Sequence, residues 1–125
     1  CNIMTQILLD TSFLLFIAKH NVQLNSLESI FGKIEFILLD TVLEELKHIS
    51  FSKSIKKNSA KLALNFVKNF KIVKFDYVSD VDTSILIYSQ KHSVNVATCD
   101  KKLRKQLKDL YIRVISPRQN QLIVD

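Results

Sequence analysis

The chain has 125 residues, and 47% of them are hydrophobic, which suits one globular domain with one core. A single glycine, Gly32, and a single proline, Pro117, exclude a glycine-rich phosphate loop, so a ligand site must be built from side chains. The net charge of +6 favours a polyanionic partner such as nucleic acid, although many basic domains simply carry solvated lysines.

Short apolar runs alternate with amphipathic stretches along the whole chain. The runs suit buried parallel strands and lie at residues 7–9, 36–39, 72–75, 94–97 and 112–115, with an edge strand expected at 122–124. Apolar residues recur at helical spacing within 60–70, 85–92 and 103–110. The alternation predicts an α/β fold over residues 1–125: a doubly wound, mainly parallel twisted sheet of about five strands with helices on both faces.

The stretch "ILLDT" occurs at residues 7–11 and again at 37–41. Two copies are too few for a solenoid, and their separation is about that of one strand-helix-strand unit. We interpret the repeat as two buried strands that look alike and that each end in an aspartate.

Aspartates end four of the expected strands: Asp10, Asp40, Asp76 and Asp100. In an open α/β sheet, ligands bind outside the carboxyl ends of the strands, so these acids are expected at one edge. Each aspartate could instead be a helix N-cap, which contributes ~1 kcal/mol. A cluster of carboxylates without local cations favours a divalent ion such as Mg²⁺ or Mn²⁺.

Four motifs, in order, resemble the PIN-domain nucleases: "LLDTSFLL", "VLEELKHI", "VDTSIL" and "VATCDKKLRKQL". The tail is most similar to the branch of ribosomal-RNA-processing endonucleases and their archaeal relatives. In that branch a second Asp often follows the first in the third motif, where this chain has Thr83. The resemblance implies Asp10, Glu45, Asp82 and Asp100 as catalytic and metal-binding residues. It also implies hydrolysis of RNA with Mg²⁺ or Mn²⁺, leaving a 5′-phosphate and a 3′-hydroxyl.

Capping patterns help to separate neighbouring acids. Thr41 and Glu44 form a predicted capping box, which leaves Glu45 free to face elsewhere and places Asp40 just outside the helix, supporting its start. Residues 79–82 resemble a second capping box. We expect Asp76 and Asp80 to be loop acids, with Asp80 nearer the site.

Substrate contacts are expected from two basic segments, residues 52–61 and 101–108. Ser12 could hydrogen-bond a ligand carboxylate or a substrate phosphate, or could cap its own helix. The further candidates each have an alternative as solvated surface residues: Lys101, Lys102, Arg104, Lys105 and Arg118. The three histidines, His20, His48 and His92, have no ligand spacing and are expected to be ordinary surface or core residues.

The location of the protein follows from what the sequence lacks. Cys1 and Cys99 have no disulfide or metal-ligand spacing, so we expect a reducing compartment and a small core role for Cys99. No apolar run reaches the roughly 18 residues of a membrane span, and the N-terminus has no secretory signal pattern. We therefore expect a cytoplasmic protein with no membrane partner.

Three functions compete. The first is a metal-dependent endoribonuclease, acting in RNA maturation with ribosome-assembly factors or as a toxin covered by a protein antitoxin, with a homodimer possible. The second is a non-catalytic PIN-like module for RNA binding or assembly. A phosphoaspartate receiver is the third, but its first strand would be followed by an acidic pair, whereas here it ends in the single Asp10.

Overall fold

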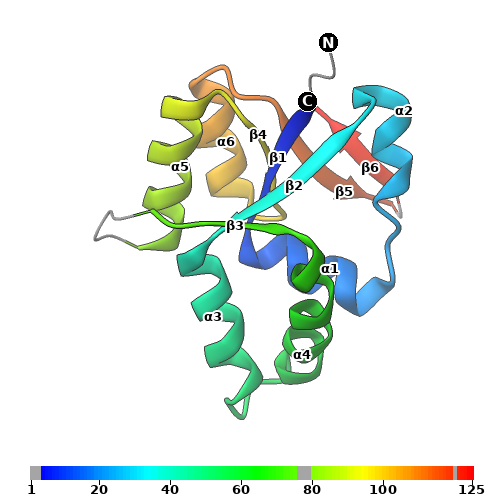
Figure 1. Cartoon of the computed structure of the whole chain (residues 1–125), viewed down its shortest axis with the longest axis vertical. Coiled ribbons are helices and arrows are strands. Elements are labelled where there is room, and N and C mark those ends of the chain that lie inside the picture. The colour runs from blue at the N-terminus through cyan, green and yellow to red at the C-terminus, as the bar shows by residue number, and fades with distance from the viewer. Residues whose placement is uncertain (1–3, 76–79, 120) are drawn as a thin grey trace.

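The computed structural model describes residues 4–75, 80–119 and 121–125. A six-stranded sheet runs through them in the order β3-β2-β1-β4-β5-β6 (Figure 1). Its strands are β1 (Thr5–Leu9), β2 (Ile34–Leu39), β3 (Lys71–Val73), β4 (Asn95–Ala97), β5 (Val114–Arg118) and β6 (Gln121–Val124). The expected strands are therefore all present, and the edge strand at the C-terminal end makes the sixth.

The sheet is parallel except at one edge, where β6 turns back along β5. The central parallel strands carry the buried apolar runs, because both faces of the sheet are covered there, whereas the edge strand β3 is largely exposed. Ile7, Leu8 and Leu9 in β1 and Ile37, Leu38 and Leu39 in β2 are all 0% exposed. The likeness of the two "ILLDT" copies follows from these two neighbouring, equally buried strands.

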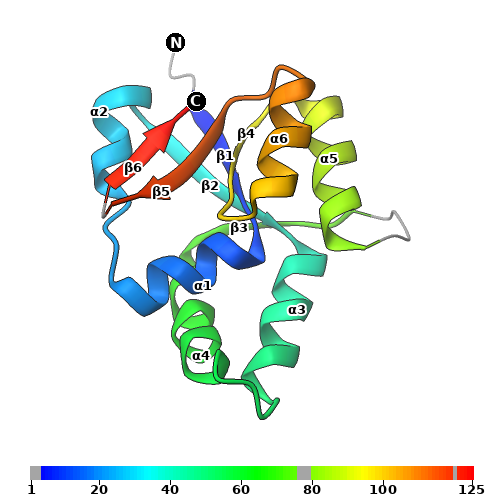
Figure 2. The ribbon, with the colours of Figure 1, turned by 180° about the vertical axis from the view of Figure 1, so that it is seen from behind.

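Helices join successive strands from β1 to β5 and form two groups (Figures 1 and 2). The α-helices are α1 (Thr11–His20), α2 (Glu28–Phe31), α3 (Asp40–Ser50), α4 (Lys57–Phe66), α5 (Val81–His92) and α6 (Lys101–Asp109). Short 3-10 turns lie at η1 (Asn25–Leu27) and η2 (Val67–Asn69). α4 packs on α1 and α3, whereas α5 and α6 contact each other.

The strand order reverses between β1 and β4. From β1 the chain adds β2 and then β3 on one side; it then crosses back through α5 to place β4 against the other side of β1. Right-handed crossovers put helices of the two directions on opposite faces of the sheet. The predicted doubly wound fold is thus confirmed, and its switch point lies between the ends of β1 and β4, where ligands bind in such folds.

Two smaller features complete the fold. Cys99 is half-buried, not a fully enclosed core residue as expected, because it lies in the loop just after β4. None of the helices in the described part of the chain combines the length and hydropathy needed to cross a bilayer.

Candidate active site

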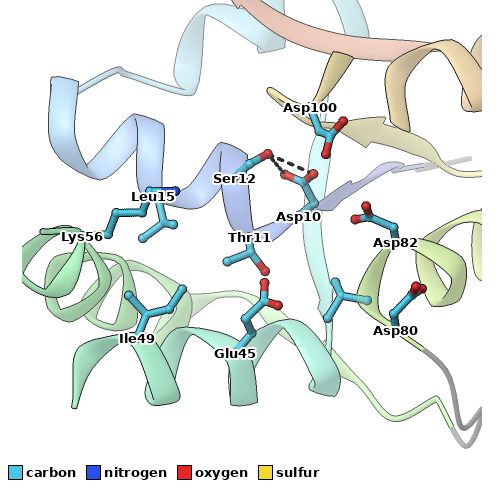
Figure 3. A pocket seen from close by; sticks show the side chains of 11 residues that line it. Asp10, Thr11, Ser12, Leu15, Glu45, Ile49, Lys56, Asp80, Asp82 and Asp100 are labelled. Atoms are coloured by element: carbon cyan, nitrogen blue, oxygen red, sulfur yellow. Dashed lines mark hydrogen bonds between the residues drawn. The ribbon is translucent and has the colours of Figure 1, made fainter. Parts of the chain in front are cut away.

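A pocket of about 320 Å³ opens at the switch point of the sheet (Figure 3). Five acidic residues line it, and they come from the segments just after β1 and β4, from the second turn of α3 and from the start of α5. These acids are Asp10, Glu45, Asp80, Asp82 and Asp100. All four acids implied by the motif resemblance therefore border one pocket, together with Asp80.

Asp10 is fixed at the centre of this pocket by its own helix. It is the N-cap of α1, and its Oδ1 accepts a hydrogen bond from the backbone N–H of Phe13 at 2.8 Å. The Ser12 hydroxyl donates to the same carboxylate, 2.9 Å from Oδ1. Only 3% of Asp10 is exposed. The cap role and the pocket role thus belong to the same residue.

Ser12 lies inside α1, so it does not cap the helix. Its hydroxyl faces Asp10 and also accepts a hydrogen bond from the backbone N–H of Cys99 at 3.1 Å. It thereby ties the start of α1 to the end of β4. Of the two alternatives for Ser12, the structure supports the contact with the Asp10 carboxylate.

Thr98 is a site residue that sequence reasoning missed. It is fully buried, its hydroxyl donates to Oδ2 of Asp10, and the same hydroxyl accepts from the backbone N–H of Asp100 at 3.0 Å. Thr98 therefore joins the two aspartates at the switch point. A threonine directly after a buried strand has no sequence signature of its own. The one sequence signal for Thr98 is its position two residues before Asp100 in "ATCD".

The burial of Asp10 has an electrostatic cost. Desolvation raises the pKa of Asp10 from 3.8 to about 6, and the Asp82 carboxylate adds to the rise. The hydrogen bonds from Thr98, Phe13 and Ser12 act in the opposite direction. A buried acid with a perturbed pKa in a cleft indicates a functional site.

Asp82 faces the same pocket from α5. Burial raises the pKa of Asp82, followed by the like charges of Asp100, Asp80 and Glu45, whereas Lys102 lowers it. The N-cap of α5 is Asp80, whose Oδ1 accepts from the backbone N–H of Thr83 at 2.8 Å. The predicted capping box over residues 79–82 is therefore wrong, and its first position, Ser79, lies outside the described residues.

Asp100 caps α6 and borders the pocket at once. Its Oδ1 accepts hydrogen bonds from the backbone N–H groups of Lys102 at 2.8 Å and Leu103 at 3.1 Å. Both cap bonds use one oxygen. The N-cap prediction for Asp100 is therefore correct. Like Asp10, Asp100 caps a helix and also lines the pocket.

Of the two adjacent glutamates on α3, Glu45 lines the pocket and Glu44 does not, as expected, but the reason is not the predicted capping box. Glu45 is partly buried and lines the pocket with Ile49, one helical turn further on. Glu44 is exposed and lies 3.6 Å from Lys47. α3 begins at Asp40, and Thr41 makes no capping bond, so the predicted Thr41–Glu44 capping box is wrong.

The second "ILLDT" aspartate does not border the pocket. Asp40 is the first residue of α3, not the residue before it, and its Oδ1 accepts from the backbone N–H of Thr41 at 3.0 Å. The same oxygen accepts from the backbone N–H of Phe75. Asp40 thus supports the start of α3, while Asp76 lies outside the described residues.

The basic candidates divide into three positions. Lys102 lies near the acids, since its charge lowers the pKa of both Asp80 and Asp82. Lys56, in the basic segment 52–61 but not singled out, lines the pocket on its other side. The remaining α6 residues line a separate shallow surface, formed by Lys101, Arg104, Lys105, Lys108 and Asp109.

Two arginines expected to contact the substrate lie elsewhere. Arg104 pairs with the carboxylate of Asp125, and Lys108 lies 4.0 Å from the same carboxylate. Arg118, exposed at the end of β5, is not among the residues that line the pocket. The hydrogen bond and charge of Arg104 lower the pKa of Asp125, and Arg118 contributes more weakly. Arg104 and Arg118 therefore lie near Asp125, which follows β6, and do not line the acidic pocket.

The oxygen-rich lining of the pocket fits an open cation site and not a closed one. Within the described residues, no three acidic, histidine or cysteine side chains are close enough to form a preassembled cage. The acidic side of the pocket nevertheless offers carboxylate and hydroxyl oxygens, and neighbouring carboxylates contribute to the raised pKa values of Asp10 and Asp82. Mg²⁺ keeps several waters and contacts one or two carboxylates directly, so an open set of this kind fits a hydrated ion better than a closed cage would.

A doubly wound sheet that gathers acids at its switch point has the architecture of a PIN-type fold. The family model for PIN-like domains matches residues 7–120, and this chain belongs to that family. It is 34% identical over 125 residues to ribonuclease VapC4 of Methanocaldococcus jannaschii, covering 94% of each chain. The resemblance to PIN-domain nucleases that the motifs indicated is confirmed.

Solved structures agree at the level of the fold. The PIN domain endonuclease Utp24 superposes with a TM-score of 0.79 at 20% identity, covering 96% of this chain and 90% of the other. VapBC2 from Rickettsia felis, solved with a DNA fragment from its promoter, gives 0.68 at 17% identity, covering 91% and 100%.

Proposed function

We propose that this protein is a divalent-metal-dependent endoribonuclease that hydrolyses phosphodiester bonds in RNA. The observation that carries the proposal is the convergence of Asp10, Glu45, Asp82 and Asp100 on one pocket. Like charges there raise the pKa of Asp82, so the cluster favours a cation. The ribonuclease named among its relatives supports the same reaction.

The proposed roles follow from the contacts. The four acids would hold Mg²⁺ or Mn²⁺, which when bound lowers the pKa of water and neutralises charge on the phosphate. Ser12 and Thr98 keep the Asp10 carboxylate oriented toward the pocket. Lys102 and Lys56 lie on either side and attract a phosphate chain that the acids alone would repel.

Two biological settings suit this reaction. One is RNA maturation with ribosome-assembly factors; the other is a toxin whose site a protein antitoxin covers. The similarity to VapC4 and VapBC2 favours the second. A small gene next to this one, whose product copurifies with the protein and blocks cleavage, would identify the antitoxin. The size of the protein in solution, alone and with that product, tests the homodimer.

Cleavage of mixed cellular RNA tests the proposal. We expect fragments with Mn²⁺ or Mg²⁺, none with EDTA, and none from Asp10→Asn at the same metal concentration. Calorimetric titration should show binding of Mn²⁺, which should also raise the melting temperature by mass action. Absence of both cleavage and binding at millimolar metal would leave a non-catalytic PIN-like module.

A further inference from the structure

A second groove continues the acidic pocket along the outer surface of α1. It has a volume of about 380 Å³ and shares Ser12, Leu15 and Lys56 with the pocket. One wall is a stripe on α1 at helical spacing: Ser12, Leu15, Phe16, Lys19 and His20. The facing wall consists of Ile55, Lys56 and Ser59, at the start of α4 and just before it.

The lining of this groove is apolar at its base and basic at its rim. Leu15 is 8% exposed, and Phe16 is partly exposed above it. The rings of Phe16 and His20 contact each other in a tilted arrangement, with their centres 4.4 Å apart and their planes at 39°. Ile55, opposite, is 99% exposed. Lys19 and Lys56, both exposed, add positive charge.

Building on the proposed function, we infer that this groove binds an unpaired nucleotide of the RNA strand next to the cleaved phosphate. Its base lies against Phe16 and His20, and its phosphates face Lys19 and Lys56. Because the groove is continuous with the acidic pocket, a nucleotide bound in it lies next to the phosphate that is cleaved. The two lysines provide positive charge that complements a polyanion.

The same lining selects against a duplex. Bases in a double helix already stack on each other, so their faces cannot lie on an aromatic side chain, whereas unpaired bases stack readily on aromatic rings. The groove therefore accommodates an unpaired base and not a base pair. A protein segment is the competing occupant, but it would not use the two lysines unless it were acidic.

Binding measured in EDTA tests the inference without cleavage. Fluorescence anisotropy would compare a labelled oligouridine strand with an abasic strand of equal length and with an RNA duplex. Phe16→Leu keeps an apolar side chain and removes the aromatic face. We expect about fivefold or more weaker binding of oligouridine, at the low end of aromatic stacking, and an unchanged affinity for the abasic strand.

Lys56→Ala serves as the second arm, because Lys56 faces phosphates. It should weaken binding of both strands and lower the salt slope by roughly 0.7. The matched control is Phe51→Leu with Lys68→Ala, which removes the same residue types from exposed positions on another surface, beside α3 and α4. The control variant should bind both strands like the wild type.

The outcomes separate this inference from the proposed function. Cleavage by the wild type together with unchanged oligouridine binding by Phe16→Leu would overturn the groove assignment and leave the groove to a protein segment. Weakened binding by Phe16→Leu together with no metal-dependent cleavage would support the nucleotide site and overturn the nuclease. If Phe16→Leu weakened the binding of the oligouridine and abasic strands equally, the proposed contact between Phe16 and a base would also be overturned.

Discussion

The backbone N–H of Phe75 lies 3.3 Å from Oδ1 of Asp40 and donates a hydrogen bond to it across 35 positions of the chain. This contact ties the segment after β3 to the start of α3. The Asp40 carboxylate, although it follows the same apolar run as Asp10, is thus engaged with backbone groups outside the pocket. Identical local sequence has produced one structural and one pocket aspartate.

The pH dependence of stability should reveal the buried Asp10. Because its pKa rises from 3.8 to about 6 on folding, the folded protein binds more protons than the unfolded chain in this range. Metal-free stability should therefore fall as the pH rises from about 4 to 6, by about 3 kcal/mol for this group. Urea unfolding in EDTA would measure it.

The matched variant for that measurement is Asp10→Asn, which removes the titrating group but can still cap α1. The stability of this variant should lack the part of the pH dependence that comes from Asp10. At pH 7 it should equal or exceed the stability of the wild type. Other acids still titrate, so the difference between the two proteins is the relevant quantity. Parallel pH curves would show that Asp10 does not carry a raised pKa.

Thr98 should control both the charge and the position of Asp10. Its hydrogen bond is the largest effect that lowers the Asp10 pKa, so Thr98→Val should raise that pKa further. Loss of a partner that orients a ligand carboxylate typically costs about 10–100-fold in activity. Thr98→Ser keeps the hydroxyl and should restore most of it. Equal cleavage rates for Thr98→Val and the wild type would remove Thr98 from the site.

The neighbouring glutamates of α3 offer a paired test. Glu45→Gln should abolish cleavage, because Gln is a poor ligand for a hard cation. Glu44→Gln should stay active, since Glu44 is exposed beside Lys47, and such surface pairs contribute little. Cleavage rates and melting temperatures of the two variants would be compared directly. An inactive, fully folded Glu44→Gln would reverse the assignment.

The lysines of α6 should bind phosphates without reading sequence. Replacing Lys101, Lys102 and Lys105 with Ala should weaken RNA binding and reduce the salt slope by about 0.7 for each lost contact to a single strand. Replacing Lys47, Lys68 and Lys71, on the face near β3, is the charge-matched control. Equal slopes in both triple variants would mean that α6 is merely a solvated basic helix.

Much of the site could be predicted because most of its acids follow buried strands or lie at the start of a helix. Asp10 and Asp100 end apolar runs, and parallel strands bring such ends to one edge. The exact start of α3 could not be predicted, because the local pattern at Thr41 and Glu44 suits a capping box. The distant Phe75 N–H favours a helix that begins at Asp40, and nothing near Asp40 in sequence encodes that contact.

Contacts between distant segments also explain the missed residues. Thr98 reaches Asp10 across 88 positions, and Lys56 enters the pocket from the turn before α4. Arg104 was expected to contact RNA, but β6 returns antiparallel along β5 and brings Asp125 to it. In each case the contact depends on strand order or helix packing, which a single sequence does not specify.

The most direct test compares RNA cleavage by Asp10→Asn and Asp40→Asn in the same Mn²⁺ assay, with melting curves for both. Asp10→Asn should be inactive yet folded, because relief of repulsion in the acidic pocket offsets the change. Asp40→Asn should retain most of its activity, because Asn can still accept the backbone bonds at the start of α3. Cleavage by Asp10→Asn at the wild-type rate, or an Asp40→Asn protein that is folded and equally inactive, would contradict the assignment of catalysis to the acidic pocket.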